Sequence, residues 1–163
     1  MEIRLAKRSD YQQCVNLNKS LFSTGKWPNF LEARIADARM YVAGADGQVV
    51  GFITFETNFV GCLYVSLLTV HPDFRRKGVA RRLIEKVATH SWNGKLFSST
   101  EEDNEVSRKM HVALGFRMSG YIDNLPQPTR EVIYYKELSP NTYGIPLPIP
   151  EARKAQLPDE MTC

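Results

Sequence analysis

The chain has 163 residues, of which 43% are hydrophobic and 24% are charged, and its formal net charge at pH 7 is +3. This composition suits one globular domain with one core, and no window approaches the roughly 18 consecutive apolar residues of a membrane span. We therefore expect a cytoplasmic protein with neither export nor membrane insertion. The cysteines Cys14, Cys62 and Cys163 are scattered without metal-ligand spacing, which predicts neither disulfides nor a metal site.

Strand patterns and helix patterns alternate over residues 1–138, which is typical of a mixed α/β domain. In chain order we expect a strand at 3–6, a helix capped by Ser9 or Asp10, a short helix at 29–38, strands at 40–45, 48–57 and 62–70, a helix at 78–91, a strand at 96–99, a helix at 103–114, and strands at 116–122 and 132–138. Asp46-Gly47 predicts a hairpin, because this dipeptide readily adopts positive φ. In the helix at 103–114, Asp103 is the expected N-cap and Gly115 the expected left-handed residue after the last turn.

The composition changes after residue 138. A run of prolines crowds a stretch with almost no periodicity, namely Pro140, Pro146, Pro148, Pro150 and Pro158. We therefore expect a domain at 1–138 and a Pro-rich C-terminal extension at 139–163. The apolar residues Ile145, Leu147 and Ile149 favour packing of this extension against the domain or against a second copy in a homodimer.

The segment after the strand at 62–70 carries a chemical signal. The turn His71-Pro72-Asp73-Phe74 is followed by Arg75-Arg76-Lys77-Gly78-Val79-Ala80, which opens a helix. A helix start offers unpaired N–H groups and the positive end of a dipole, so together with basic side chains it favours a phosphate or a pyrophosphate. Gly78 lets the backbone approach such a ligand closely. Judged by charge alone, the same basic cluster could be a solvated helix face.

The sequence VHPDFRRKGVARRL, which begins at Val70, resembles the coenzyme-binding motif of the GNAT superfamily of N-acetyltransferases. Arg75, Gly78 and Ala80 match its Gln or Arg, its Gly, and its Gly or Ala, and the resemblance covers about residues 1–138. It implies the GNAT fold, an α/β (α+β) architecture whose mixed, mostly antiparallel sheet has about seven strands, with helices on both faces and acetyl-CoA at the splay between the fourth and fifth strands. The residues implied to bind this co-substrate are Leu68, Thr69, Val70, Arg75, Arg76, Lys77, Gly78, Val79, Ala80, Arg81, Asn104 and Ser107.

The predicted helix at 103–114 carries a polar stripe of Asn104, Ser107 and His111. The adjoining face is apolar and is formed by Val106, Met110, Ala113 and Leu114. We expect this stripe to lie between the core and an open cleft, although a capping Asn, a neutral Ser and a satisfied core histidine would give the same pattern. Many GNAT members have a tyrosine where this chain has His111. The resemblance therefore implies that His111 is the general acid or orients the thioester, and an imidazolium of pKa about 6.5 can protonate a thiolate of pKa about 8.5.

The general base of many GNAT members is a glutamate at the position of Ser66, which cannot serve as a base. Hairpin pairing across the turn at 58–61 could bring Glu56 near Tyr64, on the face that Ser66 shares. Glu56 is then either a base acting through a bridging water or an exposed strand carboxylate. Tyr64 is either a core residue or part of a proton path. Proximity in a ternary complex can supply much of the rate without a strong base.

These residues predict an N-acetyltransferase that moves an acetyl or short acyl group from acetyl-CoA to a primary amine by direct attack in a ternary complex. The acceptor is expected to be a small molecule or a peptide, held by walls at residues 22–30, including Lys26 and Trp27, and at 123–130. An alternative is a regulatory module that binds acyl-CoA without efficient catalysis, because the usual tyrosine and glutamate are absent. Nucleic-acid binding is disfavoured, since the basic cluster lacks interleaved aromatic residues.

Overall fold

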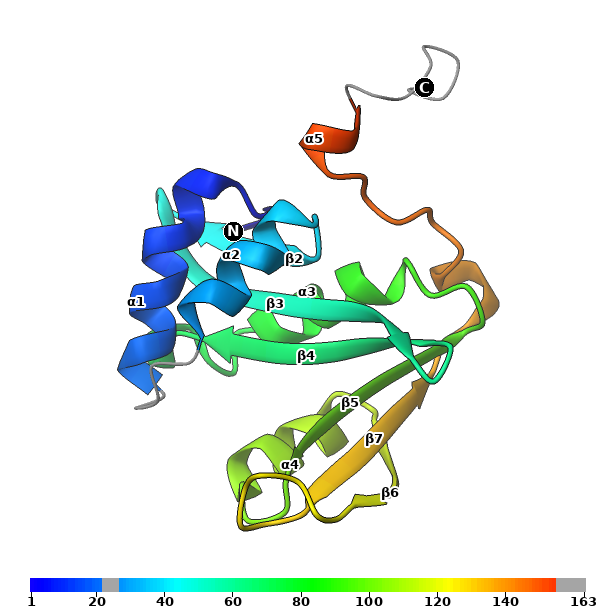
Figure 1. Cartoon of the computed structure of the whole chain (residues 1–163). Coiled ribbons are helices and arrows are strands. Elements are labelled where there is room, and N and C mark those ends of the chain that lie inside the picture. The colour runs from blue at the N-terminus through cyan, green and yellow to red at the C-terminus, as the bar shows by residue number, and fades with distance from the viewer. Residues whose placement is uncertain (22–26, 155–163) are drawn as a thin grey trace. The chain divides into compact units, whose positions relative to one another are not determined.

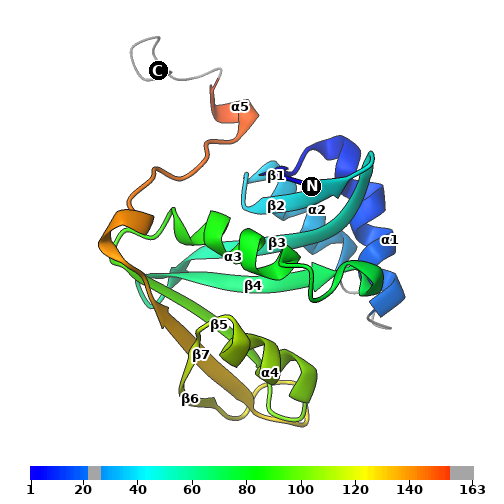
Figure 2. The same ribbon diagram turned by 180° about the vertical axis from the view of Figure 1, so that it is seen from behind.

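The computed structural model describes residues 1–21 and 27–154. Seven strands of the described chain form one mixed sheet in the order β1-β2-β3-β4-β5-β7-β6 (Figures 1 and 2). The chain divides into two compact units. Within the described residues, the first comprises 1–54, 67–83 and 146–154, and the second comprises 55–66 and 84–145.

The first unit contains all of β1 (Glu2–Leu5) and β2 (Met40–Ala45). It also contains β3 (Gln48–Phe59) up to Thr54 and β4 (Cys62–Val70) from Leu67 onward. β1 pairs with β2 and β2 with β3, both antiparallel. The predicted hairpin is confirmed, because Asp46 (φ 50°) and Gly47 (φ 79°) both adopt the left-handed conformation between β2 and β3. This is the φ pattern of the type I′ turn that matches the twist of paired strands.

Helices α1 (Tyr11–Leu21) and α2 (Pro28–Ala36) lie on one side of these strands, and the start of α3 (Val79–Ala88) lies on the other side (Figures 1 and 2). The core of the first unit forms beneath α1 and α2, where Cys14, Leu31 and Phe52 are fully buried. Burial raises the pKa of the Cys14 thiol to about 12, so this thiol is inert packing material. Cys14 and Cys62 are free thiols, and Cys163 lies outside the described residues.

Gly51 on β3 brings the start of α3 close to the sheet. A Cβ atom at this position would lie 3.0 Å from the carbonyl oxygen of Thr69 and 3.1 Å from Cγ1 of Val79. Both separations are tighter than an ordinary van der Waals contact, so a side chain at position 51 would displace one of its neighbours. The missing side chain therefore determines how closely α3 packs on β3 and β4.

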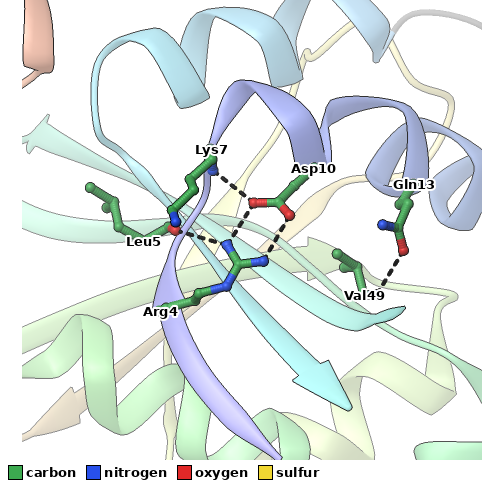
Figure 3. Close-up of polar contacts among 6 residues, drawn as sticks. All are labelled: Arg4, Leu5, Lys7, Asp10, Gln13 and Val49. Atoms are coloured by element: carbon green, nitrogen blue, oxygen red, sulfur yellow. Dashed lines mark hydrogen bonds and ion pairs between the residues drawn. The ribbon is translucent and has the colours of Figure 1, made fainter. Parts of the chain in front are cut away.

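A polar cluster joins β1 to the residues before α1 (Figure 3). Asp10 accepts hydrogen bonds from both terminal nitrogens of Arg4, at 2.7 and 2.8 Å, and from the backbone N–H of Lys7 at 2.8 Å. The Arg4 guanidinium holds the pKa of Asp10 below its usual range. The sequence pattern predicted a helix cap at Ser9 or Asp10, but the Asp10 carboxylate binds Arg4 and a short 3-10 turn, Arg8–Asp10, precedes α1. Gln13 extends the cluster by accepting from the Val49 N–H.

The second unit contains β5 (Lys95–Glu101), α4 (Glu105–Ala113), β6 (Arg117–Ile122) and β7 (Glu131–Glu137). β7 pairs antiparallel with both β5 and β6. β4 and β5 are parallel, and their pairing joins Leu63, Tyr64 and Val65 to Leu96, Phe97 and Ser98. This short parallel junction matches the splay expected between the fourth and fifth strands, and the predicted mixed, mostly antiparallel sheet of about seven strands is confirmed.

Helix α4 differs from its prediction in its cap and in its buried face. Asn104, not Asp103, is the N-cap, because its side chain accepts from the Ser107 N–H at 3.1 Å. Val106 is 75% exposed, whereas His111 is only 3% exposed. Leu114 is buried as predicted and Met110 is half-buried, whereas Ala113 is exposed. The inward face thus includes His111, which finds hydrogen-bond partners inside, together with only part of the apolar set. Gly115 (φ 84°) ends the helix as expected.

The described part of the extension contains a 3-10 turn, Pro140–Thr142, and the short helix α5 (Glu151–Lys154). In the second unit, the N–H groups of Gly144 and Ile145 donate to the carbonyls of Ser91 and Thr89, at 2.9 and 2.8 Å. In the first unit, Arg39 donates to the Pro148 carbonyl at 2.9 Å. The residues after 138 are therefore hydrogen-bonded to the domain although they lack periodicity. Among the helices within 1–21 and 27–154, none has the length and apolar character that crossing a bilayer requires.

Candidate active site

The basic turn after β4 adopts an unusual backbone. A 3-10 turn, Pro72–Phe74, leads into Arg75, whose side chain donates to the Val70 carbonyl at 3.2 Å. Arg76 (φ 57°) and Gly78 (φ 79°) are both left-handed. Residues other than Gly, Asn and Asp rarely adopt this conformation, so the backbone of Arg76 is strained. Such strained residues cluster at active sites and ligand-binding turns.

Helix α3 begins directly after this turn. Its first hydrogen bond to the turn runs from the Arg82 N–H to the Gly78 carbonyl at 3.0 Å. The N–H groups just before Arg82 belong to the first helical turn, which has no intrahelical acceptors. The side chains of Arg76, Lys77 and Arg81 are exposed. Backbone donors, the helix dipole and three cationic side chains thus meet at one helix start, which is suited to a pyrophosphate.

The end of β4 leads into this turn. Leu68 and Val70 are half-buried, whereas Thr69 between them is only 2% exposed, as expected for alternating faces of a strand. The Thr69 hydroxyl is buried and has no hydrogen-bond partner among the described residues. The predicted coenzyme residues from Leu68 to Arg81 therefore form one continuous segment of the first unit.

The remaining predicted coenzyme residues, Asn104 and Ser107, belong to the second unit. Asn104 is exposed at the start of α4, and Ser107 is half-buried one turn later. Their roles within the described chain are structural, since Asn104 caps the helix through the Ser107 N–H. The Asn104 amide and the Ser107 hydroxyl still have further hydrogen-bonding capacity.

His111 lies inside the second unit between α4 and the sheet. Its ring stacks on Tyr134 with centroids 4.5 Å apart, and its edge meets Phe116 at 5.5 Å. Nδ1 lies 2.8 Å from the Ser107 carbonyl oxygen, and Nε2 lies 2.8 Å from the Ser98 hydroxyl. A carbonyl oxygen only accepts, so Nδ1 carries the proton and Nε2 accepts from Ser98. Burial lowers the pKa of His111 below 6.5, which favours this neutral tautomer.

Glu56, Tyr64 and Ser66 lie together in the second unit, as the hairpin pattern predicted. The Ser66 hydroxyl donates to Oε1 of Glu56 at 3.3 Å. Tyr64 stacks on Phe59 with centroids 4.7 Å apart. Burial raises the pKa of Tyr64, and a hydrogen bond to Ser99 partly offsets this rise. The negative charges of Glu131 and Glu56 add smaller increases.

The structure adds two polar residues that sequence reasoning missed. The Tyr64 hydroxyl lies 2.6 Å from Ser99 Oγ, and Ser99 donates to Oε1 of Glu131 at 2.5 Å. The other carboxylate oxygen of Glu131 accepts from the Gln127 side chain at 3.1 Å. Ser99 and Glu131 are separated by 32 residues, so only the pairing of β5 with β7 brings them together. The sequence carried one faint signal, a carboxylate just before the strand predicted at 132–138.

The faces of β5 separate these groups from His111. Ser98 and Thr100 are buried on the face that α4 covers, whereas Phe97, Ser99 and Glu101 point to the opposite face. Glu101 pairs with Glu131 across the β5–β7 ladder and accepts from Thr129 at 3.1 Å. Around Tyr64 and Ser99, the opposite face carries the carboxylates of Glu131 and Glu56, and this part of the face is suited to a cationic ligand.

The expected acceptor walls are only partly described. Residues 22–26, including Lys26, lie outside the described residues. Trp27 meets Phe30 edge to face at 5.5 Å, in the first unit. In the loop at 123–130, Arg130 forms a double hydrogen bond to the Glu102 carboxylate, at 2.9 Å each, and lies 3.7 Å from the Tyr121 ring centroid. No cluster of three or more histidine, cysteine, aspartate and glutamate side chains within the described residues could hold a metal ion.

A mixed sheet with a short parallel junction, followed by a basic turn at a helix start, defines a class of enzymes that transfer acyl groups from coenzyme A. A sequence model of the acetyltransferase (GNAT) family matches residues 8–116. A crystal structure of a GNAT-family acetyltransferase from Bacillus cereus ATCC 10987 is 32% identical, with a TM-score of 0.76 over 85% of this chain and 97% of that one. The chain belongs to the acetyltransferase (GNAT) family, and the prediction of an acetyl-CoA-dependent N-acetyltransferase is confirmed.

One curated relative and one further solved structure are also similar to this chain. The aminoglycoside N(6′)-acetyltransferase type 1 of Salmonella typhimurium is 29% identical, and the match covers 84% of this chain and 99% of the relative. Arabidopsis thaliana Naa50, solved with the bisubstrate analogue CoA-Ac-MVNAL, shares 20% identity at a TM-score of 0.68 over 84% of this chain and 98% of that one. This second likeness shows the shared fold.

Proposed function

We propose that the protein transfers the acetyl group of acetyl-CoA to a primary amine of a small polycationic acceptor, by direct attack in a ternary complex. The observation that carries this proposal is the strained, basic turn at Arg76 and Gly78 immediately before α3. The alternative is a regulatory module that binds acyl-CoA without turnover, and it predicts the same turn with no acetylated product.

Three segments of the chain are proposed to contact the coenzyme. The turn from Arg75 to Arg81 would hold the pyrophosphate with backbone N–H groups and cationic side chains. The strand end at Leu68–Val70 would pair its backbone with the amides of the pantetheine arm, as in the family resemblance. Asn104 and Ser107 are proposed to contact the same coenzyme from the second unit. The bound thioester supplies the acetyl group, which is activated for attack by an amine.

The acceptor is proposed to be cationic because of the second unit's sheet face. The charges of Glu56 and Glu131 act on Tyr64 on this face, and Glu131 also accepts a hydrogen bond from Ser99. Carboxylates and aromatic rings together favour ligands with several ammonium groups. The Salmonella relative named as an aminoglycoside acetyltransferase supports the same class, since aminoglycosides carry several amines.

His111 is proposed to help orient the thioester through the groups that it contacts, rather than to protonate the leaving thiolate. Its Nδ1 proton is held by the Ser107 carbonyl, and its Nε2 is occupied by the Ser98 hydroxyl. Because burial lowers its pKa, His111 is neutral at pH 7 and has no spare proton to give. Glu56 remains a candidate base through a bridging water.

Thermal unfolding with acetyl-CoA, CoA and dephospho-CoA tests the coenzyme site. Ligand at about 100 times its Kd stabilises the native state by about 2.7 kcal/mol, which for a domain of this size raises Tm by about 5–10 °C. A panel of polyamines, aminoglycosides and monoamines then tests transfer, with product mass as the readout. A Tm shift without product from any amine would favour the regulatory module, and no shift at millimolar ligand would contradict both.

A further inference from the structure

Tyr64, Ser99 and Glu131 form a hydrogen-bonded row in the second unit, drawn from β4, β5 and β7. The two contacts are 2.6 and 2.5 Å long, and Gln127 fixes the far oxygen of Glu131. We infer that Glu131 is the final receiver of the proton that the acceptor amine loses, through the hydroxyls of Tyr64 and Ser99. This inference rests on the proposed function and names the proton route within it.

The direction of the row follows from its chemistry. An ionised carboxylate only accepts, so the single hydroxyl proton of Ser99 points to Glu131. Ser99 Oγ must then accept from Tyr64, whose hydroxyl proton points to Ser99. The lone pairs of Tyr64 Oη therefore face away from Ser99, and no other described residue donates to them. An ionised Glu131 thus polarises Tyr64 into a hydrogen-bond acceptor for an N–H group.

The proton step balances along this row. A neutral amine attacks the thioester carbonyl carbon, a C–N bond forms, and the nitrogen becomes positively charged. One N–H proton passes to Tyr64 Oη while the Tyr64 proton passes to Ser99 Oγ and the Ser99 proton passes to Glu131 Oε1. The C–S bond then breaks, and the departing thiolate takes a proton from solvent. The half-buried, newly neutral Glu131 returns its proton to water, which restores the row.

Glu131 fits this role better than Glu56 does. Glu56 accepts from Ser66 at 3.3 Å, whereas Glu131 accepts a much shorter bond from the hydroxyl that Tyr64 contacts. The raised pKa of Tyr64, caused first by burial, keeps the phenol protonated at neutral pH. A neutral phenol can pass a proton on while receiving one, so Tyr64 relays the proton and Glu131 keeps it.

The test compares Glu131→Gln with the matched control Glu101→Gln, which neutralises the carboxylate paired with Glu131 on the same ladder but outside the row. A glutamine at 131 still accepts from Ser99 but cannot take a proton. The measurement is kcat with acetyl-CoA and either spermidine or a 6′-amino aminoglycoside, whichever the wild type acetylates faster. We expect kcat to fall about 100-fold in Glu131→Gln with little change in KM. The control should stay close to wild type.

Two further readouts separate proton transfer from a structural role. In mixtures of H2O and D2O, kcat of the wild type should fall along a curved line, because several protons move together, and Glu131→Gln should lose this curvature. The double variant Ser99→Ala/Glu131→Gln should be no slower than the slower of the two single variants, since residues of one relay act as a unit. Full additivity of the two losses would overturn the relay.

The two proposals fail in different ways. Wild-type protein without an acetyl-CoA shift in Tm would overturn the proposed function, and the relay with it. An intact shift and intact wild-type turnover, with Glu131→Gln as fast as Glu101→Gln, would overturn the relay alone. Equal losses in both variants would also overturn it, because they would indicate that charge on the face, not proton transfer, matters.

Discussion

Both burial and neighbouring charges change the pKa of the Tyr64 phenol. Burial raises its pKa above 10, and the charges of Glu131 and Glu56 raise it further. We therefore predict that Glu131→Gln lowers the pKa of Tyr64 relative to wild type, while Glu101→Gln leaves it unchanged. The measurement is a pH titration of 13C-labelled tyrosine by NMR, with the Tyr64 signal assigned by its loss in Tyr64→Phe. A pKa that rises in Glu131→Gln would contradict the described contact.

The buried His111 is expected to make the stability of the protein depend on pH. Its folded pKa is lowered by burial, so the unfolded chain binds a proton at a pH where the folded protein does not. Its stabilising effect is complete above the unfolded pKa of about 6.5 and is lost as pH falls from there toward the folded pKa. Wild-type stability from urea unfolding should therefore decline below about pH 6.5, and His111→Phe should lose this part of the decline.

The same substitution tests the role of His111 in turnover. His111→Phe leaves the Ser98 hydroxyl with only the Val65 carbonyl, 3.5 Å away, as acceptor and should cost about 1–3 kcal/mol of stability at pH 7. We expect lower turnover with a nearly unchanged acetyl-CoA shift in Tm. Substitution of the half-buried His71, in the turn before α3, provides the control for a histidine that the core does not hold. Unchanged turnover would remove His111 from the reaction.

At the scale of elements, the turn before α3, which is proposed to hold the coenzyme's pyrophosphate, carries backbone strain at Arg76. Arg76→Gly should relieve left-handed strain of about 1 kcal/mol and raise the Tm of the free protein. It should also reduce the acetyl-CoA shift, because a cation at the helix start is lost. Asp46→Gly is the matched control, since Asp46 has a similar φ of 50° in a hairpin far along the chain from this turn. The control should leave the acetyl-CoA shift unchanged.

Elements also show what the sequence could and could not predict. The Asp46-Gly47 hairpin, the strand at 62–70 and the basic turn depend on neighbouring residues, and each was predicted correctly. The apolar face predicted for α4 was right for Leu114, which is buried, but wrong for Val106, which points outward. His111 is polar yet buried, because it is satisfied by Ser98. The Ser99–Glu131 contact could not be predicted, since it depends on the register of strands separated by 32 residues.

At the scale of the whole chain, residues 139–150 are predicted to contribute to stability. Gly144 and Ile145 hydrogen-bond to Ser91 and Thr89, and the Tyr143 ring lies 3.0 Å from where a Gly94 Cβ would be. A chain ending after residue 138 should melt about 4–10 °C lower, whereas one ending after residue 150 should melt close to the full chain. Equal Tm values for both truncations would contradict this. Light scattering on the same proteins tests whether the extension holds a homodimer together.

If the turn before α3 holds the coenzyme as proposed, Gly51 influences acetyl-CoA affinity without belonging to the proposed contact residues. A single methyl group there would push on Val79, the first residue of α3, or on the backbone of Thr69 at the end of β4. Both neighbours flank the turn proposed to hold the pyrophosphate. In a genetic screen, a Gly51→Ala allele would therefore behave as a coenzyme-binding defect while every residue of the binding motif kept its identity. Tuning of affinity in this enzyme can thus proceed from a neighbouring strand that lies beneath the helix, through helix position alone.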